Sequence, residues 1–262
     1  WRGDTGVDQR GELGLDRAEV RRRNLISPAD MPYTSPLKSR DGANIVLDSG
    51  DFIAGQDKLL DLIDYEGFPS RQKAALSDGR YLGIGIGNYT KGTGRGPFES
   101  AIVRIQPSGQ ITVATGASEQ GQGIIHSLAQ ICAEALGVNP EAVSVTGGDT
   151  SAVSIGMGTF ASRQAVTAGT SVHVAATELR NKALKIGAHM LEAAEEDLEL
   201  VDGTVRVRGV PEMAVPLGKI AHAVAGTPGF ALPFGIEPGM EAEHNFMPEG
   251  LAYCSGSQAA EV

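Results

Sequence analysis

The stretch "GASEQGQGIIHSLAQICAEALG", residues 116–137, sets glycines around a glutamate and a glutamine and then continues as a helix. Apolar residues recur at helical spacing from Ile124 to Ala135, and Gly137 stands where a C-cap is expected. The N-terminus of a helix offers N–H groups without partners and a partial positive charge. The pattern therefore predicts a turn that binds an anionic or oxygen-rich ligand.

A second segment has the same order of glycine loop and helix. It is "GDTSAVSIGMGTFASRQAVTAG", residues 148–169. Two such helix ends that converge would form a cradle for a polyanion. The alternative is that both segments are simple loop-to-helix connections with capping residues, with Ser162 as an N-cap. Neither segment is a G-x-x-x-x-G-K-[ST] loop or a G-x-G-x-x-G turn after a clear strand, so the pattern alone leaves both interpretations open.

The rest of the chain alternates between helical and strand patterns, which predicts an α+β fold of mixed sheets with packed helices. Helical spacing covers about 16–25, 55–65, 69–77, 124–136 and 162–194. Alternating apolar residues predict strands at about 81–90, 100–106, 110–116 and 142–148, and a hairpin over 198–207 that turns at Asp202-Gly203. The tail from Thr227 onward, with its glycines and prolines, is predicted to be mostly loop.

Composition and charge narrow the function classes. A net charge of −10 argues against a general binder of nucleic acid or anionic membranes, because such binding depends on a basic surface. No stretch approaches the roughly 20 apolar residues of a membrane span. The two cysteines exclude a disulfide framework, and the five histidines show no ligand spacing, so the sequence predicts no transition metal held by protein ligands.

Three ordered motifs span most of the chain. The segment "GRGPFESAIVRIQPSGQITVATGASEQGQGIIHSLAQICAEALGV" is followed by "GGDT" and then by "GMGTFASRQAVTAG". These elements resemble, in order, the molybdenum-cofactor-binding region of the large subunit of xanthine oxidase family molybdenum hydroxylases. The most similar variant is the aerobic carbon monoxide dehydrogenase large-subunit type. "ELGLDRAEVRRRNLI" also resembles the helix that closes the first molybdopterin-binding domain of the family.

The resemblance implies a domain organisation and a set of cofactor-binding residues. Residues 1–75 would be the C-terminal part of the first molybdopterin-binding domain, and residues 76–262 would be most of the second. Gln122 would bind an oxo ligand or a pterin-side group from the turn it forms with Gly121 and Gly123. The pyranopterin would lie against a second set of residues, together with the N-terminal arginine. This set comprises Gly158, Thr159, Phe160, Ala161, Ser162, Arg163, Gln164 and Arg2.

The cofactor implied by the resemblance is molybdopterin cytosine dinucleotide, with molybdenum held by the pterin dithiolene and by no protein ligand. The implied reaction is hydroxylation of a small organic substrate, or oxidation of carbon monoxide, with water as the oxygen source. In the family the general base is a glutamate of a G-x-G-E motif near the C-terminus of the large subunit. The chain reaches "QAAEV" before any such motif, and Glu119 is expected to be a structural carboxylate of the turn, so no catalytic residue is assigned. His126 is expected to lie at the surface.

The resemblance also implies partners and a location. These are an iron–sulfur subunit with [2Fe–2S], an FAD subunit and the remainder of the large subunit, in the cytoplasm. Two other interpretations stay open at this stage. One is a non-catalytic remnant or cofactor-binding scaffold, and the other is a phosphate-binding module unrelated to molybdenum, which rests only on the two helix N-termini.

Overall fold

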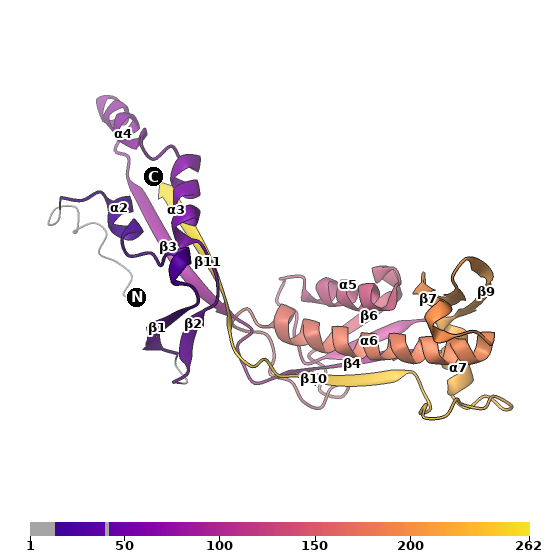
Figure 1. Cartoon of the computed structure of the whole chain (residues 1–262). Coiled ribbons are helices and arrows are strands. Elements are labelled where there is room, and N and C mark those ends of the chain that lie inside the picture. Colours follow the sequence, from indigo (N-terminus) through magenta and orange to yellow (C-terminus); the bar gives the residue numbers. More distant parts are fainter. Residues whose placement is uncertain (1–13, 40–41) are drawn as a thin grey trace. The chain divides into compact units, whose positions relative to one another are not determined.

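The computed structural model describes residues 14–39 and 42–262. Arg2, predicted to lie by the cofactor, falls outside these residues. The described chain divides into two compact units. One comprises the described residues up to Gly92 together with Ala252–Val262, and the other comprises Thr93–Leu251. The predicted α+β class is confirmed, since both units combine helices with mainly antiparallel sheets (Figure 1).

The larger unit is built on a four-stranded sheet in the order β10-β4-β5-β6. Its strands are β4 (Glu99–Ile105), β5 (Ile111–Thr115), β6 (Val143–Gly147) and β10 (Glu241–Phe246). β4 pairs antiparallel with β5 and β10, whereas β5 and β6 are parallel, joined through a helix. The short turn at residues 107–109 closes the β4–β5 hairpin as predicted, with Gly109 at a φ of 88°.

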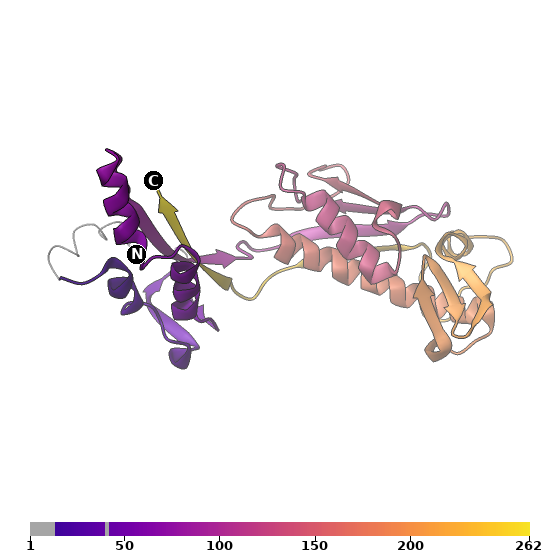
Figure 2. The same cartoon turned by 90° about the horizontal axis from the view of Figure 1, so that it is seen from above.

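Two helices, α5 (Ile124–Leu136) and α6 (Gln164–Leu191), lie side by side over one face of this sheet (Figures 1 and 2). The buried residues of α6 recur at helical spacing, from Ala168 and Val172 to Leu179 and Ile186. Small residues let the helices approach closely, since a Cβ at Gly169 would lie only 3.1 Å from Ile131 Cδ1. The main hydrophobic core therefore fills the layer between the two helices and the sheet.

A second, three-stranded sheet lies in the same unit. It contains β7 (Leu198–Val201), β8 (Thr204–Val207) and β9 (Val210–Pro216), all antiparallel, and α7 (Leu217–Val224) follows. The predicted turn at Asp202-Gly203 is confirmed, with both residues at positive φ, which is the geometry that tight hairpins prefer. The short helices η2 (Pro140–Ala142) and η3 (Glu195–Asp197) complete the unit.

The smaller unit contains the helices α2 (Arg17–Arg22), η1 (Pro28–Asp30), α3 (Phe52–Leu62) and α4 (Phe68–Ser77). Its strands form two separate pairs. β1 (Tyr33–Lys38) pairs with β2 (Asn44–Leu47), and β3 (Ile84–Thr93) pairs with β11 (Ala252–Glu261). The predicted N-cap is confirmed, because the Asp16 carboxylate accepts from the N–H groups of Ala18 and Glu19.

The tail from Thr227 onward is irregular over 227–240 and 247–251, as predicted, but the prediction missed two strands within it. β10 completes the edge of the main sheet, and β11 pairs with β3. Both strands are rich in polar and small residues, with Ala242 the buried residue of β10. Their strand conformation comes from pairing with distant partners, which local propensity does not report. No helix within the described ranges has the length and apolar character needed to cross a bilayer.

Candidate cofactor-binding site

The two glycine-bearing segments meet in the structure. Thr159 links them, because its hydroxyl donates to Ser118 O at 2.7 Å and accepts from Ser118 N at 2.9 Å. The Gln120 side chain donates to Thr159 O at 3.1 Å. Behind these contacts the backbones of Gly116 and Gly156 touch, and a Cβ on Gly156 would lie 2.7 Å from Gly116 Cα. The convergence expected from two such loops is therefore observed, and it needs glycine at both contact positions.

The N-terminus of α5 is not open to an anion, which corrects the expectation for this helix end. The Glu119 carboxylate accepts from the N–H groups of Gly123 at 2.9 Å, Ile125 at 3.1 Å and Gly121 at 3.2 Å. These hydrogen bonds, that from Ile125 foremost, hold the pKa of Glu119 below its usual value, with a smaller contribution from His126. Glu119 is thus the structural carboxylate of this turn, as predicted, and His126 is exposed beside it.

Gln122 lies on the exposed surface of the same turn and folds back over its backbone. Its Oε1 accepts from Gln120 N at 2.6 Å, and its Nε2 donates to Ser118 O at 3.3 Å. An amide nitrogen carries two N–H groups, so one N–H of Gln122 remains for a ligand. Gly121 and Gly123 have φ values of 88° and 75°, a conformation that glycine adopts readily and that shapes this turn.

The N-terminus of α6 differs, because no side chain caps it. Ser162 is not the N-cap: α6 begins after Arg163, and Ala161 and Ser162 have φ values of 49° and 54°. In the part of the chain that the structure describes, the N–H groups of Thr159–Ser162 donate no hydrogen bond. This end of α6 therefore presents a row of free donors together with the positive end of the helix dipole.

A buried ion pair holds the loop before α6 in this conformation. Arg163 and Glu99 are both fully buried, and Arg163 Nη1 lies 2.6 Å from Glu99 Oε2. The guanidinium also donates to the carbonyl oxygens of Arg95, Gly158 and Phe98. Arg163 was predicted among the cofactor-binding residues, and the structure gives its side chain a supporting position under the loop. Left-handed backbone at residues other than glycine costs on the order of 1 kcal/mol each, so the loop needs such support.

Glu99 was not predicted from the sequence, although a signal for it exists. It precedes Ala101, Val103 and Ile105 at two-residue spacing along β4, and all three are buried. The alternation therefore places Glu99 on the buried face of the strand, where a carboxylate requires partners. Its Oε1 accepts from Met157 N at 3.3 Å and Ser100 N at 3.4 Å, and its Oε2 accepts from Gln164 Nε2 at 3.3 Å in addition to Arg163.

Gln164 carries the clearest sign of a missing partner. It is 5% exposed, its Nε2 is bonded to Glu99 and to Thr159 Oγ1, and its Oε1 has no hydrogen-bond partner. A buried acceptor of this kind is normally satisfied. The free N–H groups of the loop and the unpaired Oε1 together suit a ligand that has both anionic oxygens and N–H donors, as a pterin with its phosphate does.

The side chains around this loop are apolar and exposed. Ile155, Met157 and Phe160 are 45%, 42% and 43% exposed, and the Arg163 guanidinium lies 5.1 Å from the centre of the Phe160 ring. Among the described residues, no three His, Cys, Asp or Glu side chains gather in a way that could hold a metal ion.

The fold and the open end of α6 define a cofactor-binding domain with two converging loops. A family model described as molybdopterin cofactor-binding domain matches residues 58–262. The chain belongs to this family.

Relatives of known function support the assignment. The carbon monoxide dehydrogenase large chain of Hydrogenophaga pseudoflava is 34% identical over 259 residues, which cover 94% of this chain and 31% of that protein. The nicotine 6-hydroxylase large subunit of Paenarthrobacter nicotinovorans is 35% identical over 235 residues, covering 85% of this chain and 28% of that protein. The chain thus spans about a third of the length of the curated relatives it matches.

Solved structures give the same result. Quinoline 2-oxidoreductase from Pseudomonas putida 86 is similar with a TM-score of 0.80 and 33% identity over 97% of this chain and 33% of that chain. Reconstituted CO dehydrogenase from Oligotropha carboxidovorans gives a TM-score of 0.78 at 33% identity, over 96% of this chain and 32% of that chain. The aldehyde oxidoreductase from Desulfovibrio desulfuricans ATCC 27774, at 18% identity and a TM-score of 0.64 over 98% of this chain and 25% of that chain, shows the shared fold.

Proposed function

We propose that this chain is the molybdenum-cofactor-binding portion of the large subunit of a molybdenum hydroxylase. The complete enzyme would hydroxylate a small organic substrate, or oxidise carbon monoxide, with water as the oxygen source. The observation that carries the proposal is the open N-terminus of α6, with its free N–H groups and the unpaired Gln164 Oε1 beside the Gln122 turn. Relatives named as carbon monoxide dehydrogenase and nicotine 6-hydroxylase subunits support the reaction class.

The residues of the site divide into two groups by their role. The backbone of Thr159–Ser162 would donate to anionic oxygens of the cofactor, and Gln164 Oε1 would accept from one of its N–H groups. The free N–H of Gln122 would donate to an oxo ligand or a pterin-side group of the cofactor. The glycines at 121, 123 and 158 have no side chain and would let the backbone approach the cofactor closely. Arg163 and Glu99 position the loop and do not touch the ligand. Molybdopterin cytosine dinucleotide, when bound, supplies the redox chemistry.

The proposal assigns no general base within these two loops. The carboxylate of Glu119 accepts from three N–H groups, and that of Asp149 accepts from the N–H and hydroxyl of Ser151. Glu99, on β4 beneath the second loop, is paired with Arg163.

The proposal assigns 1–75 to the end of the first molybdopterin-binding domain and 76–262 to the second, with Arg2 near the cofactor. These limits describe domains of the complete subunit and not the compact units seen here. Iron–sulfur and FAD subunits in the cytoplasm would carry the electrons away.

The test compares Gln122→Ala with Gln130→Ala in the complete enzyme. Gln130 is exposed on α5 outside the site and serves as the matched control. Loss of a hydrogen bond to a charged group is worth about 1.5–3 kcal/mol, so Gln122→Ala is expected to lower turnover about tenfold to a hundredfold. In urea unfolding the control should match wild type, and Gln122→Ala should lose only about 1 kcal/mol, for its two exposed hydrogen bonds within the turn. Equal losses of turnover and stability would exclude a role of Gln122 at the metal.

A further inference from the structure

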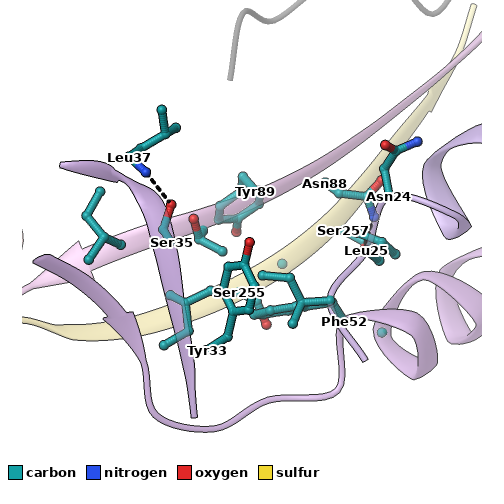
Figure 3. A pocket seen from close by; sticks show the side chains of 16 residues that line it. Asn24, Leu25, Tyr33, Ser35, Leu37, Phe52, Asn88, Tyr89, Ser255 and Ser257 are labelled. Atoms are coloured by element: carbon teal, nitrogen blue, oxygen red, sulfur yellow. Dashed lines mark hydrogen bonds between the residues drawn. The ribbon is translucent and has the colours of Figure 1, made fainter. Parts of the chain in front are cut away.

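The chain passes between the two compact units twice. The first connection, residues 94–98, leads from β3 into β4, and the second, residues 247–251, leads from β10 into β11. In the larger unit β4 pairs with β10. In the smaller unit β3 pairs with β11, where Asn88 Nδ2 donates to Ser257 Oγ at 2.9 Å (Figure 3). Both connections therefore join one pair of neighbouring strands to another.

The first connection is held by the loop before α6. The Arg163 guanidinium donates from Nε to Arg95 O at 2.6 Å and from Nη2 to Phe98 O. In the other direction, Gly94 N donates to Ser162 O at 3.2 Å. One set of hydrogen bonds thus contains both the loop that presents free N–H donors and the chain that connects to the smaller unit.

This connection also packs closely against the loop and the start of α6. Gly94 and Gly96 have φ values of 75° and 111°, a conformation that favours glycine. A Cβ on Gly96 would lie 2.9 Å from Arg163 Nε, and a Cβ on Gly94 would lie 3.1 Å from Val166 Cγ1. Because the segments are in contact as well as hydrogen-bonded, a change in the loop must alter the connection.

The second connection is held by the same polar cluster. Phe246, the last residue of β10, donates from its backbone N–H to Ser171 Oγ at 3.1 Å. The Ser171 hydroxyl in turn donates to Glu99 O at 2.8 Å. Ser171 and Glu99 are fully buried, and the Glu99 carboxylate pairs with Arg163. Both connections are therefore tied to one buried ion pair.

Ligand binding would act on this cluster through the loop before α6. Ala161 and Ser162 have φ values of 49° and 54°, a left-handed conformation that residues with a side chain seldom adopt. A ligand that accepts from the free N–H groups of the loop stabilises this conformation relative to any other. The same conformation places Ser162 O against Gly94 and Arg163 against Glu99. Because linkage of this kind is reciprocal, holding the connections must also favour ligand binding.

We propose that Glu99, Arg163 and Ser171 couple the loop before α6 to both connections. A bound cofactor holds the two connections, and a change that loosens the connections weakens cofactor binding. Gly96 and Ser171 act through Arg163 and Glu99 as positioning residues. This inference rests on the proposed function, which places the cofactor at the N-terminus of α6.

The first test follows two reporter amides with and without the cofactor. Gly94 and Phe246 donate their N–H groups to Ser162 O and Ser171 Oγ, so their hydrogen exchange reports how each connection is held. Exchange is measured on the complete large subunit, either loaded or purified from cells that make no molybdopterin. Loss of the cofactor should speed both amides by about fivefold or more, while the amides of β8, outside the cluster, stay unchanged. No change at either reporter amide would overturn the coupling.

Gly96→Ala tests the reverse direction, from connection to cofactor. Gly209→Ala is the matched control, because Gly209 has a φ of 77° and a Cβ there meets nothing within 4 Å. Both changes strain the backbone, but only Gly96→Ala displaces Arg163. In the loaded subunit Gly96→Ala should shorten the half-time of pterin release by about fivefold or more and speed exchange at Phe246, whereas Gly209→Ala should do neither. Equal pterin release from the two variants would contradict the proposal.

Ser171→Ala tests the same coupling without added bulk, and it applies even if Gly96→Ala does not fold. The change breaks the link from Phe246 to Glu99. In the loaded subunit it should speed exchange at Gly94 as well as at Phe246, and faster exchange at Phe246 alone would overturn the coupling. Molybdenum and pterin are measured in the same samples. A loaded wild-type subunit with any of the contrary results rejects the coupling alone, whereas a wild-type subunit without molybdenum and pterin rejects the proposed function and the coupling with it.

Discussion

Replacing Glu99 by glutamine tests whether the buried ion pair holds the cofactor loop. Glu99 accepts from four donors, which are Arg163 Nη1, Gln164 Nε2 and the N–H groups of Met157 and Ser100. A glutamine of the same shape must turn its NH₂ toward some of these donors, and it leaves the buried guanidinium without a counter-charge. Breaking a buried ion pair from one side costs about 3–5 kcal/mol. The three carbonyl acceptors of Arg163 remain, so we expect a loss near 3 kcal/mol.

Urea unfolding of wild type, Glu99→Gln, Arg163→Gln and the double variant forms a double-mutant cycle. The double variant should be more stable than the sum of the two single losses predicts, because each single change strands the other partner. Hydrogen exchange should also rise at the amides of Met157 and Arg163, which donate to Glu99 Oε1 and to Phe160 O in the folded loop. A loss below about 1 kcal/mol for Glu99→Gln, or an additive cycle, would refute the assigned supporting role.

The remaining predictions concern the glycine contact, the two thiols and the turn carboxylate. Gly116→Ala should lower the free energy of unfolding in urea by about 1–3 kcal/mol, because the new Cβ would lie 2.7 Å from Gly156 Cα. Gly87→Ala is the control and should leave stability unchanged, since a Cβ there meets nothing within 4 Å. Equal losses of stability in the two variants would contradict the contact. Burial raises the pKa of Cys132 to about 12, whereas Cys254 is exposed. Iodoacetamide at pH 8 should therefore label only Cys254, as measured by mass spectrometry. Rapid labelling of Cys132 in the folded protein would contradict its burial. The hydrogen bonds to Glu119 lower its pKa in the folded protein, so the stabilisation they give is complete above about pH 4.3 and is lost as the pH falls through the pKa of the folded state. Wild type should therefore lose more stability than Glu119→Gln between pH 6 and pH 3. Parallel losses of stability in the two proteins would argue against the cap.

Local sequence patterns correctly predicted the helices and hairpins whose own side chains favour their observed conformation. The helix from Ile124, its left-handed C-cap at Gly137 and the hairpin at Asp202-Gly203 all follow the sequence. Pattern failed for β1, β2, β10 and β11, because these strands carry mixed polar and small residues and are defined by their partners. The pairing of β3 with β11 joins segments more than 160 residues apart, as the Asn88–Ser257 hydrogen bond shows, and no local propensity reports such a contact.

The candidate site shows the same division. The sequence predicted the two glycine segments and the helices that follow them. It did not predict which helix N-terminus has its N–H groups capped by a side chain and which has them free. Glu119 closes α5 through three N–H groups, whereas α6 stays open because Arg163 turns inward to Glu99, 64 residues earlier. Sequence similarity to a family indicated the candidate site, and the side-chain contacts then separate the residues that could reach a ligand from those that support them.

Molybdenum and pterin content, measured on the complete large subunit purified from its native host, tests the central claim most directly. Elemental analysis and fluorescence of the oxidised pterin should give close to one molybdenum and one pterin for each copy of this chain. Thr159→Ala, which unlinks the two loops, should lower both in parallel. A folded wild-type subunit with neither molybdenum nor pterin would contradict the account, and would mean that this domain keeps the fold without the cofactor.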